Sequence, residues 1–225
     1  MKREDDLMQK FTILTIAFLL AVTTRLFAYD DNDFQIWNTD VEEMKINDNS
    51  KISFEQEFRL GDNAGEFFYQ HYDAGYFYSL KKYLNIGGGY RYIYETKKRK
   101  FKLERAPYVT LSLLWDSKGF KFEDRSRFEY RNFQYQADAW RYRNKISMKC
   151  PWKYTKMEIQ PYLSDELLFS LSATNQLNQN RASLGIGMNL TKNIKGEIYY
   201  MLQAMKSSGK WIDANVLGTK FKLSF

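Results

Sequence analysis

The sequence predicts an all-β protein, an antiparallel up-and-down β-barrel of about ten to twelve strands that crosses the bacterial outer membrane. Three observations support this fold class. A short apolar segment near the N-terminus has the form of a secretory signal. Apolar and polar residues alternate with period two along most of the remaining chain, and the last such segment ends on Phe225.

Residues 1–28 have the features of a cleaved signal peptide. Basic residues such as Lys2 precede an apolar segment from Phe11 to Val22, and Ala28 is a small residue suited to the cleavage site. A transmembrane helix needs about twenty apolar residues, so this segment is too short to span a bilayer. We therefore assign residues 1–28 to a signal peptide and residues 29–225 to a single outer-membrane barrel domain.

The composition favours strands and excludes several classes of function. Aromatic residues make up 17% of the chain and there are only three prolines. The single Cys150 and the single His71 rule out an intramolecular disulfide and any cysteine cluster or multi-histidine metal site. No phosphate loop, dinucleotide fingerprint or calcium loop is present, so we expect no metal and no cofactor. The basic pI of about 9.2 does not predict nucleic-acid binding in an exported chain.

Each strand is predicted by alternation, because successive side chains of a strand point to opposite faces. The pattern is clearest at Phe120–Arg131 and Trp140–Trp152, where aromatic and apolar residues alternate with charged ones. The other strands are predicted, in chain order, at Asp33–Ile46, Lys51–Leu60, Phe67–Leu80, Leu84–Glu95, Leu103–Trp115, Met157–Ser170, Arg181–Leu190, Ile194–Met205 and Trp211–Phe225. Glycines at 87–89, 185 and 187 lie inside strands and indicate bends or close approach of the backbone.

The first predicted strand leaves the strand count open between ten and twelve. Bacterial barrels have an even number of strands. With a periplasmic C-terminus, an even count requires Asp33–Ile46 to form two short strands or to lie off the barrel wall.

The connections predict the polarity of the barrel. Tight turns are expected near Asn47–Ser50, Lys81–Tyr83, Asp116–Gly119, Pro151–Thr155 and Thr191–Asn193. Longer polar loops are expected near Gly61–Gly65, Thr96–Lys102, Asn132–Ala139, Leu171–Asn180 and Lys206–Lys210. Short periplasmic turns and long extracellular loops alternate in this way in bacterial barrels.

The C-terminal residues predict how the chain is assembled. Phe221, Leu223 and Phe225 alternate with polar residues, and this ending resembles the signal read by the outer-membrane barrel assembly machinery. We therefore expect that machinery to be a partner of the chain.

In a membrane barrel the apolar face must point to lipid and the charged face to the lumen. Outward tyrosines and tryptophans then suit the aromatic girdles at the two membrane interfaces, with outer-membrane lipid as the partner. The outward set is expected to include Tyr72, Tyr76, Tyr78, Tyr90, Tyr92, Trp115, Phe120, Tyr130, Trp140, Tyr142 and Trp152. A soluble secreted barrel is the alternative, and it would place these rings inside and the charges in water.

A basic hairpin is the most unusual feature of the predicted lumen. Its inward positions hold eight basic residues: Lys121, Arg125, Arg127, Arg131, Arg141, Arg143, Lys145 and Lys149. They hold two acids, Glu123 and Glu129. A pairing register symmetric about the loop would set Glu129 opposite Arg143, and a shift by two residues would change the partners but keep the face.

Two interpretations of this basic wall remain open. Acids elsewhere in the lumen could neutralise it and brace a narrow barrel; the candidates are Glu55, Glu57, Glu95, Glu158, Glu166 and Glu197. Alternatively the wall could line an anion-preferring path for a small anionic solute, since rings of arginine and lysine favour anions.

Two further features suggest other activities. His71 shares a face with Asp73, and Ser53 and Glu55 are expected on the neighbouring strand, which would suit a membrane-embedded lipid hydrolase. No nucleophile motif accompanies them. The basic run Lys97–Lys100 lies in a predicted extracellular loop and could bind lipopolysaccharide phosphates.

Several segments resemble an uncharacterised bacterial family, domain of unknown function 2490. The resemblance lies in Asp33–Trp37 (DFQIW), Arg125–Arg131 (RSRFEYR), Trp140–Ile146 (WRYRNKI), Pro161–Phe169 (PYLSDELLF) and Asn178–Leu190 (NQNRASLGIGMNL). It implies an outer-membrane barrel and supplies no catalytic residue. The sequence thus predicts a narrow anion-preferring channel or a structural envelope protein, with the hydrolase and the soluble barrel as alternatives.

Overall fold

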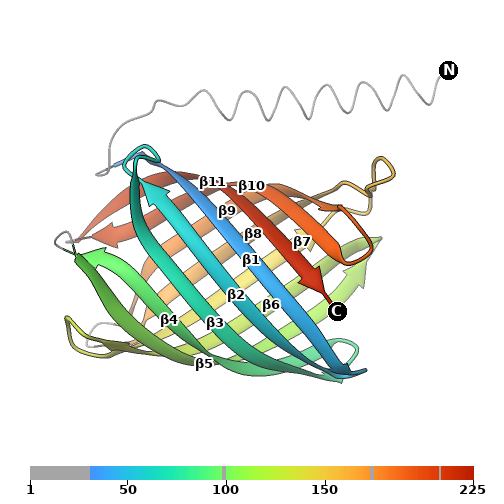
Figure 1. Ribbon diagram of the computed structural model, residues 1–225, viewed down its shortest axis with the longest axis horizontal. Helices are drawn as coiled ribbons and strands as arrows, with labels where there is room; N and C mark the ends of the chain where they lie inside the picture. The colour runs from blue at the N-terminus through green and yellow to red at the C-terminus, as the bar shows by residue number, and fades with distance from the viewer. Residues whose placement is uncertain (1–30, 98–99, 173–174, 208) are drawn as a thin grey trace.

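The computed structural model describes residues 31–97, 100–172, 175–207 and 209–225, which form a single closed barrel (Figure 1). Its strands are β1 (Asp33–Asn47), β2 (Ser50–Gly61), β3 (Glu66–Lys81), β4 (Leu84–Lys97), β5 (Lys100–Ser117), β6 (Phe120–Phe133), β7 (Ala139–Lys149), β8 (Gln160–Ser170), β9 (Gln176–Asn189), β10 (Ile194–Ser207) and β11 (Lys210–Ser224). No helix in these ranges is long and apolar enough to span a membrane. The predicted signal peptide, residues 1–28, lies outside the described residues.

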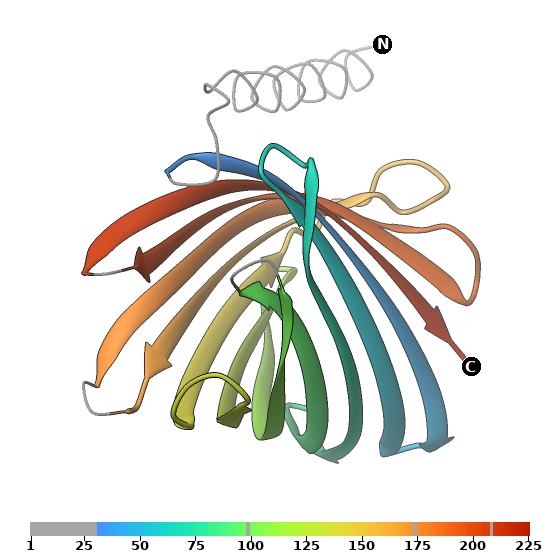
Figure 2. The ribbon, with the colours of Figure 1, turned by 60° about the vertical axis from the view of Figure 1, so that its left-hand side comes forward.

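The barrel closes through a parallel pairing. Each strand runs antiparallel to the next, and β1 lies beside β11 in parallel, from Asp33 opposite Ala214 to Glu43 opposite Ser224 (Figures 1 and 2). The prediction of an up-and-down barrel of about ten to twelve strands is confirmed, but both even counts are wrong. Asp33–Asn47 is one continuous strand of the wall, and an odd count is accommodated because the closing seam pairs two strands that run in the same direction.

The two ends of the barrel differ less than the sequence predicts. We call the end with the β1–β2 turn and the C-terminus the turn end, and the opposite end the loop end. The connection of Cys150–Ile159 between β7 and β8 lies at the turn end, although a tight turn was expected there. At the loop end, β4 stops at Lys97 and β5 starts at Lys100, so this connection is short. Trp152 belongs to the long connection, where it packs edge-on against Phe120.

The distribution of side chains is the reverse of that in a soluble barrel. Glu104, Glu129 and His71 are fully buried inside, whereas large apolar residues such as Tyr76, Val109 and Leu202 are exposed on the outer face. The predicted outward rings Tyr72, Tyr76, Tyr78, Tyr90, Tyr92, Trp115, Trp140 and Trp152 are all exposed. Charged and polar residues are therefore buried in the lumen, and an apolar surface surrounds the barrel.

On the lumen side of the wall, three tyrosine rings each lie over a glycine of the neighbouring strand. Tyr199 is paired with Gly218 on the neighbouring strand, Tyr162 with Gly185, and Tyr108 with Gly89. A Cβ atom at Gly218 would overlap the Tyr199 ring, and one at Gly185 would lie 2.7 Å from Tyr162 Cζ. Glycine is needed at these positions because the rings rest directly on the backbone, which agrees with the close approach that the sequence predicts.

We expect Gly218→Ala to lower the free energy of unfolding by about 1–3 kcal/mol, the usual cost of overpacking an interior. The added methyl group must displace Tyr199, which packs against the cluster of Trp37, Met201 and Val216. Urea unfolding in detergent, followed by tryptophan fluorescence, measures the loss. Gly187→Ala is the matched control, because a Cβ there meets nothing closer than Glu197 Cγ at 3.9 Å. Equal losses in both variants would contradict this explanation.

Candidate functional site in the lumen

The basic hairpin is formed by β6 and β7. Arg127 and Arg143 are buried at mid-height of the lumen, opposite each other on the two strands. Lys121 and Lys149 lie near the turn end and are exposed to solvent. Glu123 occupies an inward position opposite Ser147, and no described residue forms an ion pair with it. The predicted cluster is thus divided between a buried centre and an exposed rim.

The register of this hairpin is shifted by two residues from the symmetric one. Glu129 lies opposite Arg141 rather than Arg143, and Arg125 lies opposite Lys145. Asp138 anchors the connecting loop, since its carboxylate accepts hydrogen bonds from Asn132 Nδ2 at 2.9 Å and from the Phe133 backbone at 3.0 Å. These donors hold the pKa of Asp138 below its ordinary value. The loop therefore fixes a register that alternation alone leaves open.

Two buried carboxylates neutralise most of the basic wall. Glu129 accepts hydrogen bonds from Arg141 Nε at 2.5 Å and from Arg143 Nη1 at 3.1 Å. Glu166 on β8 accepts from Arg143 Nη2 at 2.8 Å and from Arg125 Nη2 at 3.1 Å. Arg181 Nη1 also reaches Glu166, at 3.4 Å. Each carboxylate is therefore shared among several guanidinium groups.

The opposite side of the lumen, formed by β2, β3 and β4, also contains ion pairs. Arg91 on β4 donates to Asp73 at 2.7 Å and to Glu55 at 3.0 Å. Arg59 Nε donates to Glu57 Oε1 at 2.7 Å. The Arg91 pairs link β2, β3 and β4, whereas Arg59 and Glu57 both lie on β2. The lumen is thus lined by ion pairs on both sides.

Aromatic and apolar side chains fill the loop-end half of the lumen. The guanidinium of Arg59 lies between Trp37 and Tyr69, 3.5 Å and 3.8 Å from the two ring centroids. Phe68 and Ile93 pack with Tyr69 in a buried cluster. Near this cluster, Arg131 donates two hydrogen bonds to Glu104, at 2.6 and 2.8 Å. These packed side chains therefore narrow this half of the lumen.

A polar cavity of about 160 Å³ lies on the turn-end side of this packing. Its lining includes Lys145, Glu197 and Lys220, which lie toward the turn end, but neither Glu104 nor Arg131. Eight of the residues that line it are basic and four are acidic. The cavity therefore carries an excess of positive charge in a narrow space, which favours anions over cations.

His71 contacts acids and a tyrosine rather than a nucleophile. Its Nε2 atom lies 3.1 Å from Glu55 Oε1, and its Nδ1 atom lies 3.1 Å from the Tyr69 hydroxyl. Ser53 pairs with Gly75, four residues further along β3, and forms no hydrogen bond with His71. The arrangement lacks the contact between Ser53 and His71 that a serine nucleophile with a histidine base requires. Within the described ranges, no group of three or more His, Cys, Asp or Glu side chains is arranged to hold a metal.

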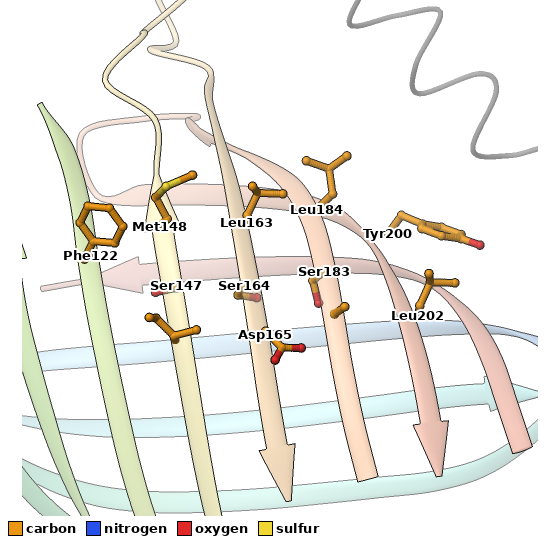
Figure 3. A pocket seen from close by; sticks show the side chains of 12 residues that line it. Phe122, Ser147, Met148, Leu163, Ser164, Asp165, Ser183, Leu184, Tyr200 and Leu202 are labelled. Carbon is orange, nitrogen blue, oxygen red and sulfur yellow. The ribbon is translucent and has the colours of Figure 1, made fainter. Parts of the chain in front are cut away.

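A shallow groove of about 470 Å³ lies on the outer face of β6–β10 rather than in the lumen (Figure 3). Exposed Leu163, Leu184 and Leu202 line it. Asp165 lies among these side chains, and Asn180 Nδ2 donates to its carboxylate at 2.7 Å. The sequence analysis did not single out this outward carboxylate, which has its polar partner on the adjacent strand.

Several lumen residues were missed at the sequence level. Arg59, Arg91 and Arg181 all line the cavity, and Tyr108 lies against Arg127. The same period-two alternation places these residues on inward positions, so the signal was present but weaker than in the hairpin. Glu158, expected as a lumen acid, instead lies in the β7–β8 connection and bonds Lys153 at 2.8 Å, because β8 begins only at Gln160.

The fold and the lumen define a class of protein: a closed β-barrel with an apolar exterior and a charged, ion-paired interior. Within that class the chain belongs to the family described as protein of unknown function (DUF2490), whose model matches residues 34–214. The resemblance predicted from the sequence is thereby confirmed. No curated protein and no solved structure matches the chain.

Proposed function

We propose that the mature chain is an outer-membrane β-barrel with a narrow, anion-preferring lumen. The membrane location is supported by the apolar exterior and by strands of at least 11 residues, long enough to cross a bilayer at a tilt. Heat-modifiable gel mobility together with outer-membrane fractionation tests it. A chain recovered in the soluble periplasm would instead support a secreted barrel.

The observation that carries the proposed selectivity is the excess of basic over acidic residues around the cavity. Fixed positive charges in a low-dielectric pore attract anions and repel cations. The packed loop-end half restricts the path to small solutes. The ion pairs of the lumen support a second candidate, a structural envelope barrel that conducts nothing, because they join neighbouring strands along the inner face of the wall.

Bilayer recordings separate the two candidates. In planar bilayers with a salt gradient we expect small unitary conductances and a reversal potential of the sign given by anion preference. Folded protein without conductance would favour the structural role, and cation preference would contradict the proposed lumen. A lipid-hydrolysis assay with His71→Ala tests the remaining enzyme alternative, in which loss of a measurable activity would implicate His71.

We expect Lys145→Gln to reduce the anion preference. Lys145 lines the cavity, and no described carboxylate lies within ion-pair distance of it, so its charge is less fully neutralised than that of the paired arginines and acts on a permeant ion. The reversal potential should move toward the value for no selectivity. Lys153→Gln is the control, since Lys153 lies outside the lumen and bonds Glu158. Unchanged selectivity in Lys145→Gln would exclude this lysine from the path.

Two further parts of the proposal concern partners and targeting. The signal peptide of residues 1–28 is tested by sequencing the N-terminus of the exported protein. Lipopolysaccharide binding through Lys97–Lys100 remains a proposal; Lys97 bonds Glu95 at 2.8 Å, and residues 98–99 lie outside the described ranges.

A further inference from the structure

Arg127 differs from the other arginines that line the lumen cavity. Arg59, Arg91, Arg125, Arg143 and Arg181 each have a carboxylate oxygen within 3.4 Å. The nearest carboxylate oxygen to Arg127 is Glu129 Oε1, which lies 3.8 Å from its Nη1 atom.

The guanidinium of Arg127 is buried with an unused donor. Its side chain is only 7% exposed, and its Nε atom has no hydrogen-bond partner within the described part of the chain. The Tyr108 ring lies 4.0 Å from the guanidinium and holds it by a cation–π contact, which uses none of the N–H groups. A buried charged donor without an acceptor is costly, so its presence indicates a missing partner.

The surroundings of Arg127 favour an anion as that partner. Arg143 on β7 lies directly opposite Arg127, and Arg125 lies on the same inward face of β6 as Arg127. Like charges placed opposite each other destabilise a pair of strands. Glu129 does not offset this repulsion alone, because its single negative charge is already shared by Arg141 and Arg143, which both donate hydrogen bonds to it. Another negative charge in the cavity that Arg127 lines would reduce this repulsion.

We infer that the lumen binds a small oxoanion of the phosphate or sulfate class, held by Arg127 with Arg125 and Lys145 beside it. Several oxygens on one ion can accept from several arginine donors at once, which a halide cannot do as well. The volume of about 160 Å³ is below the roughly 300–1,000 Å³ of pockets for drug-sized ligands, which favours a small ion. This inference deepens the proposed anion preference and rests on anions entering the lumen from water.

Binding is tested with inorganic phosphate on the folded mature protein in detergent, in buffer free of other oxoanions. We expect saturable phosphate binding by calorimetry and a rise in the urea midpoint. At free phosphate 100 times the dissociation constant, the folding equilibrium should shift about 100-fold toward the folded state. Protection by chloride equal to that by phosphate, or no protection by either, would overturn the inference.

The Arg127→Gln variant tests whether Arg127 binds the phosphate. This variant removes a buried charge that lacks an acceptor, so without phosphate it should be at least as stable as the wild type, while the phosphate-induced shift should disappear. Arg127→Lys, which keeps the charge but lacks the planar fork, should retain a weakened shift. Arg105→Gln is the matched control, because Arg105 points outward and bonds Asn132 at 3.4 Å. An unchanged phosphate shift in Arg127→Gln would exclude the site.

Bilayer recordings keep this inference separate from the proposed function. Conductance with anion preference but no phosphate binding would overturn the oxoanion site alone. Phosphate binding lost in Arg127→Gln, in a barrel that conducts nothing, would support the site and overturn the channel. Where both hold, added phosphate should reduce chloride conductance in the wild type but not in Arg127→Gln.

Discussion

Glu166→Gln is expected to destabilise the barrel by about 3–5 kcal/mol, the usual cost of removing one partner from a buried ion pair. The Glu166 carboxylate accepts from Arg143, Arg125 and Arg181, and its side chain is only 7% exposed. Glutamine preserves the shape and one acceptor oxygen but removes the charge. The three guanidinium groups then lose the negative charge that they share. Urea unfolding in detergent, followed by tryptophan fluorescence, measures the loss.

Glu158→Gln provides the matched control for this prediction. Glu158 makes the same type of contact with Lys153, but both side chains lie in the exposed β7–β8 connection. Exposed ion pairs contribute little because water and salt screen them. We therefore expect no measurable change in Glu158→Gln. A loss in Glu166→Gln as small as in this control would mean that water in the lumen screens the network, and the barrel would not depend on it.

The strands could be predicted because their signal is local. In β6, alternation alone places Phe122 and Phe128 on one face and Arg125 and Arg127 on the other, and the structure has this arrangement. The closing of the barrel could not be predicted in this way. The pairing of β1 with β11 joins residues far apart in sequence, and nothing in either strand specifies a parallel neighbour.

The lumen site was predictable in part for a related reason. Alternation gives the inward face of each strand, so Arg127, Glu129 and Arg143 could be assigned to the lumen without knowledge of their partners. Which inward residues meet depends on the loop register and on the order of neighbouring strands. The register around Asp138 differs by two residues from the symmetric one, and this shift leaves Arg127 opposite Arg143. The unpaired donor of Arg127 is therefore a property of the fold rather than of a motif.

Phe225→Ala is expected to lower the amount of protein assembled in the outer membrane severalfold in cells, while refolding of the purified chain into detergent is nearly normal. The Phe225 backbone completes the seam, since its N–H donates to Glu43 O at 3.0 Å and its carbonyl accepts from Lys45 N at 3.2 Å. Alanine keeps both of these bonds and removes only the ring. That ring is 68% exposed and Phe221 is exposed beside the same seam, so neither side chain contributes to the packed lumen.

The comparison between cells and detergent distinguishes recognition from stability. If the terminal rings act as a signal for the assembly machinery, only assembly in cells depends on them, and Phe225→Tyr, which keeps an aromatic ring, should assemble normally. Deleting Phe225 also removes the two backbone bonds, at about 0.5–1.5 kcal/mol each, and should therefore reduce stability in detergent as well. Equal losses for Phe225→Ala in both settings would contradict a signal, because the ring would then act on the stability of the barrel itself. The exposed position of the ring argues for the first outcome, since an aromatic side chain that packs against nothing inside the barrel gains its importance from what it meets outside.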